Sequence, residues 1–263
     1  MNYIKDFVKS YWKTLLFFGI VGLVGGFFTG LYLLDSYPED FRDVLVTQLG
    51  SAGLADIPVD IMLATITALQ SLGYGVILGA IGIVLGKRIG LFRDERNITK
   101  KPLAISFIIS IVGGLALILS DMLYFGRHST VIMDSYGTKP SVDYIIATVT
   151  YGAVIEEVML RLFAMSLVAF ILHLIFGKRD KKPAPAVLIA ANVISALLFA
   201  AGHLPATLIL IGNSPMIIAR CFLLNGGIGL LFGYLYRKYG LRYAMIAHGG
   251  CHIVSKLIWI LFI

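Results

Sequence analysis

Seven long apolar stretches, separated by short polar connections, form the dominant pattern of the chain. Each is near or above the roughly 20 residues that a helix needs to cross a membrane. Helices satisfy their own backbone hydrogen bonds in lipid, so the pattern predicts an all-α, polytopic transmembrane helical bundle. The predicted spans are residues 14–34, 61–86, 103–123, 143–176, 185–202, 216–236 and 243–262.

Two connections carry further structure in this interpretation. The stretch LPATLILIG, 204–212, is apolar enough for an extra short or re-entrant helix, which leaves seven or eight helices open. The acidic segment 38–60, bounded by Pro38 and Pro58, is typical of an external loop with one short surface helix.

Composition agrees with a membrane protein built as one integral-membrane domain over residues 1–263. The chain is 58% hydrophobic and 14% charged, whereas a soluble domain carries about 25% charged residues. Its mean hydropathy is +0.88. Cys221 and Cys251 both lie in apolar segments, where they are expected as small packing residues rather than as a disulfide framework.

Basic and non-basic connections alternate along the chain. The N-terminal segment and the connections GKRIGLFRDERNITKK, GKRDKK and YRKYGLR are basic, and the intervening ones are not. By the positive-inside rule this predicts a cytoplasmic N-terminus, and an external C-terminus if there are seven spans. The net charge of +7 is therefore attributed to membrane topology. We expect an integral protein of the cell (plasma) membrane that contacts membrane lipid. No nucleic-acid partner is expected.

Small and polar residues inside the spans predict helix packing. GIVGLVGG (19–26) and GYGVILGAIG (73–82) offer small faces for close helix contact. Asn192, Ser195 and Asn225 are expected to form hydrogen bonds between helices.

Three charges lie together near the middle of the fourth span, in AVIEEVMLRLFAM (153–165). Three unpaired central charges would cost on the order of 8–10 kcal/mol. Glu157 and Arg161 are at i,i+4 and can pair, which leaves Glu156 to face another group. An ion-pair network that fixes helix register is the structural alternative.

Three of the five histidines also lie in apolar spans. His203 comes four residues after Phe199 at the end of the fifth predicted span, and His248 and His252 share one face of the last span. His128 and His173 are expected to be solvated or interfacial. Simple counting puts His203 near the external end of its span and His248 near the cytoplasmic end, so a meeting with the fourth span requires broken, tilted or displaced helices.

These residues carry a resemblance to a known family. EEVMLR (156–161), FAAGH (199–203) and HGGCH (248–252) resemble, in order, the EExxxR, FxxxH and HxxxN motifs of the CPBP family. This family comprises the CaaX proteases and bacteriocin-processing enzymes, and is also called Abi. The resemblance covers residues 143–262, the expected catalytic core, with the N-terminal spans 14–123 as scaffold or substrate entry.

The resemblance implies an intramembrane endopeptidase with a water-filled, polar internal cavity. It implies Glu156 as the general base that activates water, assisted by His203, with His248 and His252 stabilising the oxyanion. It also implies supporting roles for the remaining motif residues, Glu157, Arg161 and Phe199. One position departs from the family pattern, because His252 stands where Asn is usual.

Cofactor and substrate stay open at this level. Glu156, His203 and His248 are also a credible set of ligands for a divalent metal such as zinc, although the H-E-x-x-H pattern is absent. The expected partner is a peptide or protein substrate, either prenylated or a bacteriocin or signal peptide. The alternatives are a non-catalytic membrane scaffold or immunity protein that binds a peptide, and an ion-coupled transporter that uses the Glu and His residues as a relay.

Overall fold

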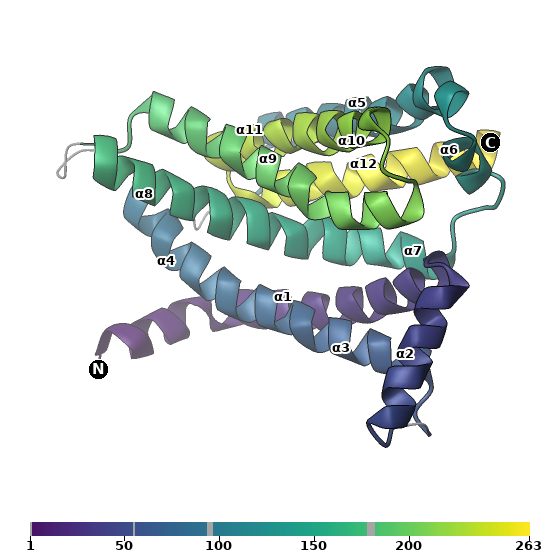
Figure 1. Ribbon diagram of the computed structural model, residues 1–263. Coiled ribbons are helices and arrows are strands. Elements are labelled where there is room, and N and C mark those ends of the chain that lie inside the picture. The colour runs from purple at the N-terminus through teal and green to yellow at the C-terminus, as the bar shows by residue number, and fades with distance from the viewer. Residues whose placement is uncertain (1, 55, 94–96, 178–181) are drawn as a thin grey trace.

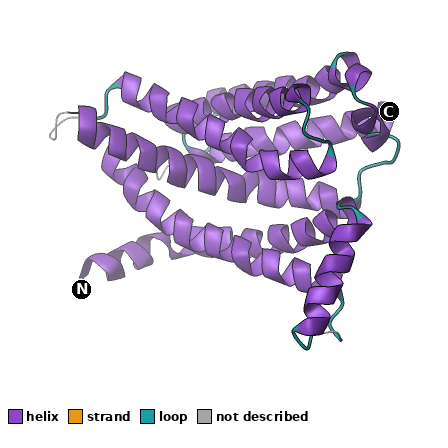
Figure 2. Cartoon of the chain, in the orientation of Figure 1, coloured by secondary structure: helices purple, strands orange, loops and turns teal. Residues whose placement is uncertain are grey.

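The computed structural model describes residues 2–54, 56–93, 97–177 and 182–263, and within these ranges every regular element is helical. Among the described residues, seven helical segments are long and apolar enough to cross a membrane. This confirms the all-α transmembrane bundle (Figure 2). The seven segments are Ile4–Ser36, Val59–Ile89, Lys100–His128, Val142–Phe176, Pro185–Leu210, Pro215–Tyr239 and Leu241–Phe262.

Several segments are built from more than one helix. The long single helices are α1 (Asn2–Ser36), α5 (Lys100–Leu123), α9 (Pro185–Leu210) and α12 (Leu241–Phe262). The other spans join two α-helices through π-helical turns: α3 (Val59–Gly73) to α4 (Gly79–Ile89), α7 (Val142–Ala147) to α8 (Ser166–Phe176), and α10 (Pro215–Cys221) to α11 (Gly227–Tyr239). The short helices α2 (Glu39–Ser51) and α6 (Thr130–Ser135) lie in connections.

The spans run side by side, and the two termini lie at opposite ends of the bundle, as an odd number of crossings requires (Figure 1). Helix α2 lies across the ends of α1 and α3 in the same view, so the acidic segment 38–60 does contain a short helix. Large apolar side chains on the outer surface remain exposed, and this is the surface that lipid covers in a membrane bundle.

Glycines bring helices into close contact, as the sequence predicts. A Cβ on Gly22 of α1 would lie 2.6 Å from the carbonyl oxygen of Ser71 in α3. A Cβ on Gly82 of α4 would lie 2.8 Å from the backbone of Leu162 in the fourth span. These contacts leave no room for a side chain, so small residues set the spacing of the helices.

Helix α9 corrects the predicted end of the fifth span. The structure continues this helix through Pro205 to Leu210, so residues 204–210 are part of the fifth helix and form no separate element. His203 therefore lies about two turns inside the helix instead of at its end. Helix α9 is continuous from Pro185 to Leu210, so it brings His203 toward the fourth span without a break.

Polar residues inside the spans have distinct partners. Asn192 donates to the carbonyl oxygen of Leu230 at 3.1 Å and Ser195 to that of Leu160 at 2.6 Å, which confirms hydrogen bonds between helices. For Asn225 the prediction was wrong, because its amide donates to the carbonyl oxygen of Cys221 one turn earlier in the same span. Cys221 and Cys251 are buried free thiols.

Candidate active site

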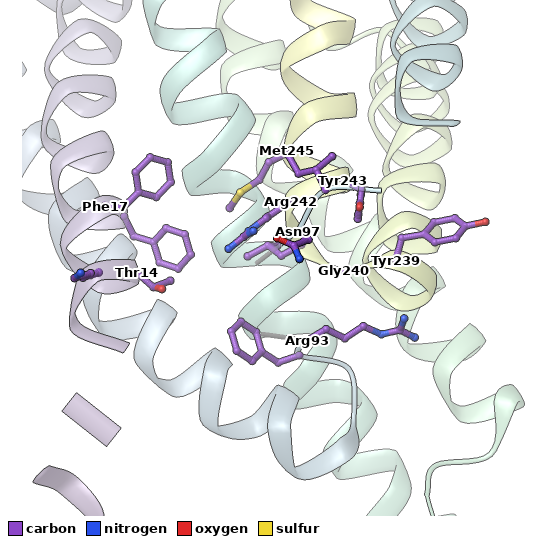
Figure 3. Close-up of a pocket in the computed structure, with 14 residues that line it drawn as sticks. Thr14, Phe17, Arg93, Asn97, Tyr239, Gly240, Arg242, Tyr243 and Met245 are labelled. Atoms are coloured by element: carbon purple, nitrogen blue, oxygen red, sulfur yellow. The ribbon is translucent and has the colours of Figure 1, made fainter. Parts of the chain in front are cut away.

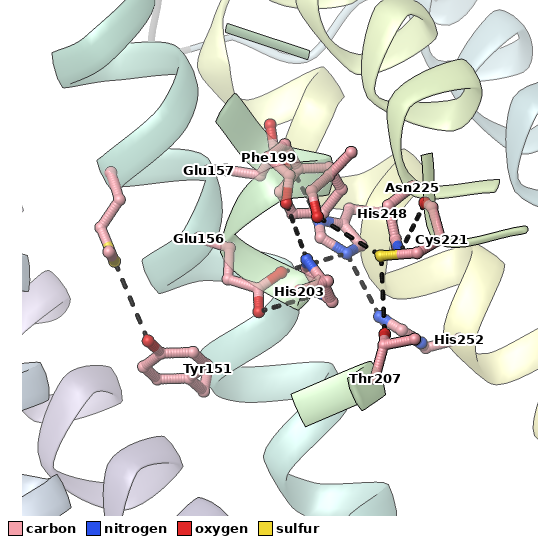
Figure 4. A network of polar contacts seen from close by, with 12 residues as sticks. Tyr151, Glu156, Glu157, Phe199, His203, Thr207, Cys221, Asn225, His248 and His252 are labelled. Carbon is pink, nitrogen blue, oxygen red and sulfur yellow. Dashed lines mark hydrogen bonds and ion pairs between the residues drawn. The ribbon is translucent and has the colours of Figure 1, made fainter. Parts of the chain in front are cut away.

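Irregular helix surrounds the acidic motif of the fourth span. Residues Thr148–Glu156 and Val158–Met165 are π-helical, and Glu157 lies between them. Such i→i+5 segments occur frequently at functional sites. Here the two neighbouring glutamates point to different surroundings (Figure 4).

Glu157 is fully buried and paired twice. Its Oε1 lies 3.1 Å from Nη1 of Arg161 and 2.9 Å from Nδ1 of His248. The Arg161 guanidinium also donates to the carbonyl oxygen of Gly229 at 3.0 Å and lies 4.5 Å from the centre of the Phe199 ring. The i,i+4 pair predicted from the sequence is present, and it neutralises one carboxylate in the core.

Glu156 instead faces a cavity. Its side chain is 18% exposed, with Oε1 3.9 Å from Nε2 of His203 and Oε2 3.8 Å from Nε2 of His248 (Figure 4). Both distances exceed those of direct hydrogen bonds. The carboxylate is therefore held near two imidazole nitrogens with room for a small molecule to bridge them.

The partners of the three histidines orient their rings. Nδ1 of His203 lies 2.9 Å from the carbonyl oxygen of Phe199, which can only accept, so Nδ1 donates to it and Nε2 faces Glu156. Nδ1 of His248 likewise donates to Glu157. Nε2 of His248 faces Nε2 of His252 at 3.2 Å.

All seven motif residues thus come together from three helices, the fourth span, α9 and α12. The remaining two histidines lie apart from this cluster. The His128 ring contacts the carbonyl oxygen of Tyr124 on the exposed turn after α5, and His173 lies near the end of α8. Neither lines the cavity.

The cavity has a volume of about 590 Å³ and includes residues that the motifs do not name. Asp121 of α5 forms two contacts of 2.6 Å with the guanidinium of Arg220 from α10. Tyr136 donates to the same carboxylate at 2.9 Å, and burial together with this negative charge raises the pKa of its hydroxyl. Further lining residues that the sequence did not assign to the site are Tyr32, Tyr144, Tyr151, Asn225 and Lys256.

A second cavity of about 270 Å³ lies elsewhere and contains none of the motif residues (Figure 3). Its walls include Lys13, Arg93 and Arg242 from three basic segments. It is separate from the chemistry of Glu156.

The metal hypothesis receives no geometric support. Within the described ranges, no group of three or more His, Cys, Asp or Glu side chains is arranged to hold a metal ion. The candidate ligands Glu156, His203 and His248 therefore do not fit that role in this arrangement.

Comparison with known proteins identifies the C-terminal part of the chain. Residues 139–254 match the family model described as type II CAAX prenyl endopeptidase Rce1-like. No curated protein and no solved structure matches the chain. The matched residues contain all three motifs and the whole Glu and His cluster. Residues 139–254 are thus similar to the CPBP family, to which the CAAX prenyl endopeptidases belong, and the seven apolar helices among the described residues indicate an integral membrane protein.

Proposed function

We propose that the protein hydrolyses a peptide bond inside the membrane, with Glu156 as the general base. The proposal is supported by the different surroundings of two adjacent carboxylates, one buried and paired and the other facing the cavity. Glu157 is 0% exposed and paired with Arg161 and His248, whereas Glu156 is 18% exposed and faces two imidazole nitrogens across the cavity. Two carboxyl groups in different environments are the usual way to divide catalytic roles.

The first step is the activation of water. A water between Glu156 and His203 can donate one hydrogen to the carboxylate and the other to the Nε2 lone pair, because the 3.9 Å separation suits a bridge. As the water oxygen attacks the carbonyl carbon of the substrate, one proton passes to Glu156. The same carboxyl group then returns this proton to the amine that leaves.

The second part is stabilisation of the oxyanion. His248 and His252 present their Nε2 atoms 3.2 Å apart, and Glu157 stabilises a protonated His248 through Nδ1. The Nε2–H groups of both rings can then donate to the oxygen of the tetrahedral intermediate. His252 can serve here in place of Asn, because both side chains are hydrogen-bond donors.

The substrate we propose is a membrane-associated or lipid-modified peptide or protein. A prenylated protein, a bacteriocin and a signal peptide all meet this description. The site lies in membrane-spanning helices, so a substrate held at the membrane reaches it without leaving the lipid. A scaffold or immunity protein needs no such division between two glutamates.

We further propose that the N-terminus is cytoplasmic, in a plasma membrane, as the charge of the connections indicates. Residues Tyr37, Tyr136 and Trp259 line one end of the cavity. They lie at the ends of spans away from the basic connections, so this orientation places that end of the cavity on the external side.

The test compares the wild type with Glu156→Gln in membranes, with new peptide termini catalogued by mass spectrometry. Gln keeps the size and polarity of the side chain but cannot act as a base. The exposed Glu39 of α2 provides the matched control, Glu39→Gln. We expect termini that occur with the wild type and the control to be absent with Glu156→Gln. Identical catalogues for all three proteins would contradict the proposal and favour the scaffold.

A further inference from the structure

A buried lysine of the last helix is not used by the reaction described above. Lys256 is 5% exposed, and its side chain lines the same cavity as Glu156 and His252. Its Nζ lies 4.1 Å from the centre of the Tyr144 ring. Among the residues that the structure describes, this ammonium forms no hydrogen bond and no ion pair.

Three other charged side chains line the cavity in the described part of the chain: Asp121, Glu156 and Arg220. Arg220 is neutralised by Asp121 through two contacts of 2.6 Å. Glu156 lies between His203 and His248. A charged group inside a membrane protein is costly unless it is paired, and it commonly marks a substrate path. Lys256 thus offers a positive charge to the cavity without an internal counter-ion.

We propose that Lys256 binds the C-terminal α-carboxylate of the peptide substrate and so determines which bond is cleaved. This inference rests on the proposed protease function. An α-carboxylate is the complementary charge, and it enters a buried site as the end of a chain. An acidic side chain within a peptide would need room for the chain on both sides. The ring of Tyr144 positions the ammonium through a cation–π contact.

The spacing along α12 relates this anchor to the reacting groups. Lys256 follows His252 by one turn and His248 by two turns on the same helix, a rise of about 12 Å from His248 at about 1.5 Å per residue. An extended peptide covers this length with about three to four residues at about 3.3 Å each. The anchor therefore selects cleavage a short, fixed distance from the end of the substrate.

The test measures binding and cleavage with one matched pair of probes. The probes are a fluorescent peptide with a farnesylated cysteine three residues before its C-terminal residue, made as the free acid and as the carboxamide. The proteins are wild type, Lys256→Met, Lys256→Arg and Lys139→Met, all in nanodiscs. Lys139 is an exposed lysine near the same end of the bundle that contacts the carbonyl oxygens of Trp259 and Ile260, so its substitution controls for loss of charge outside the cavity.

We expect the wild type and Lys139→Met to bind the acid about 10- to 100-fold more tightly than the amide, the range for one hydrogen bond to a charged group. Lys256→Met should bind both forms as weakly as the wild type binds the amide, and Lys256→Arg should restore part of the preference. A structural lysine would instead weaken both forms equally when replaced. That result would overturn the inference. Equal affinity of the wild type for the acid and the amide, or no binding of either, would also overturn it. If the acid is preferred but neither form is cleaved, the carboxylate anchor stands and the protease function fails.

Discussion

The Glu157 carboxylate and the His248 imidazole, 91 residues apart in the chain, meet with 2.9 Å between Oε1 and Nδ1. The same oxygen lies 3.1 Å from Nη1 of Arg161. Glu157 therefore connects the fourth span to α12 and fixes which nitrogen of His248 carries a proton. Glu157, which the family motif suggests as an electrostatic support, therefore also orients the His248 ring.

The first prediction separates the two adjacent glutamates. Glu157→Gln removes a buried charge that Arg161 and His248 share, so it should lower the free energy of unfolding by about 3–5 kcal/mol, as when one partner of a buried ion pair is lost. It should also reduce kcat, because His248 loses its carboxylate partner. Glu156→Gln should abolish cleavage with little change in stability, since Glu156 has no direct ion pair within hydrogen-bond distance. Thermal unfolding and peptide cleavage of both purified variants provide the measurement, and the opposite pattern would contradict the assignment of roles.

The second prediction concerns Arg161 as the counter-ion. Arg161→Met leaves the Glu157 charge with His248 alone and should destabilise the protein by about 3–5 kcal/mol. In the double variant with Glu157→Gln the charge that Arg161 neutralised is also absent, so the combined loss should be smaller than the sum of the single losses. Denaturation of the two single variants and the double variant measures this coupling. The exposed Arg42 of α2 supplies the control, because Arg42→Met should change stability by no more than about 0.5 kcal/mol. Additive losses would show that the two side chains do not interact energetically.

The third prediction tests the histidine that replaces Asn in the last motif. His252 faces Nε2 of His248 at 3.2 Å. His252→Asn keeps a hydrogen-bond donor near the cavity, so kcat should stay within about tenfold of the wild type. His252→Leu removes the donor and should lower kcat by about 10²–10³-fold, the usual cost of losing one donor to an oxyanion. The two variants remove the same imidazole, so a similar loss in both would assign a function to the ring itself rather than to hydrogen-bond donation.

Local sequence patterns predicted which side chains the structure brings together at the cavity. The pairing of Glu157 with Arg161 follows from helical spacing, and so does the shared face of His248 and His252. The same spacing could have identified Lys256, which lies four residues after His252 on that face. Its charge inside an apolar span was the available signal.

Other features depend on contacts between distant segments or on backbone detail. The sequence left residues 204–212 open as an extra short or re-entrant helix, whereas α9 continues through Pro205 to Leu210, because helices inside membranes tolerate proline. The π-helical turns around Glu157 leave no pattern in composition. The pairing of Asp121 with Arg220 joins residues 99 positions apart, so no local periodicity could predict it.

The last prediction concerns the space in front of Glu156. A Cβ on Gly152 would lie 3.3 Å from Nε2 of His252 and 4.0 Å from Oε2 of Glu156. Gly152→Val adds two methyl groups on this Cβ, beside the reacting groups, and should reduce kcat/KM by about 10²-fold, as displacements near 1 Å do in active sites. Gly73 of α3 provides the matched control, because a Cβ there meets nothing within 4 Å, so Gly73→Val should retain activity. Cleavage assays on the two variants at equal amounts of folded protein make the comparison. Full activity of Gly152→Val would mean that the substrate does not approach Glu156 through this part of the cavity.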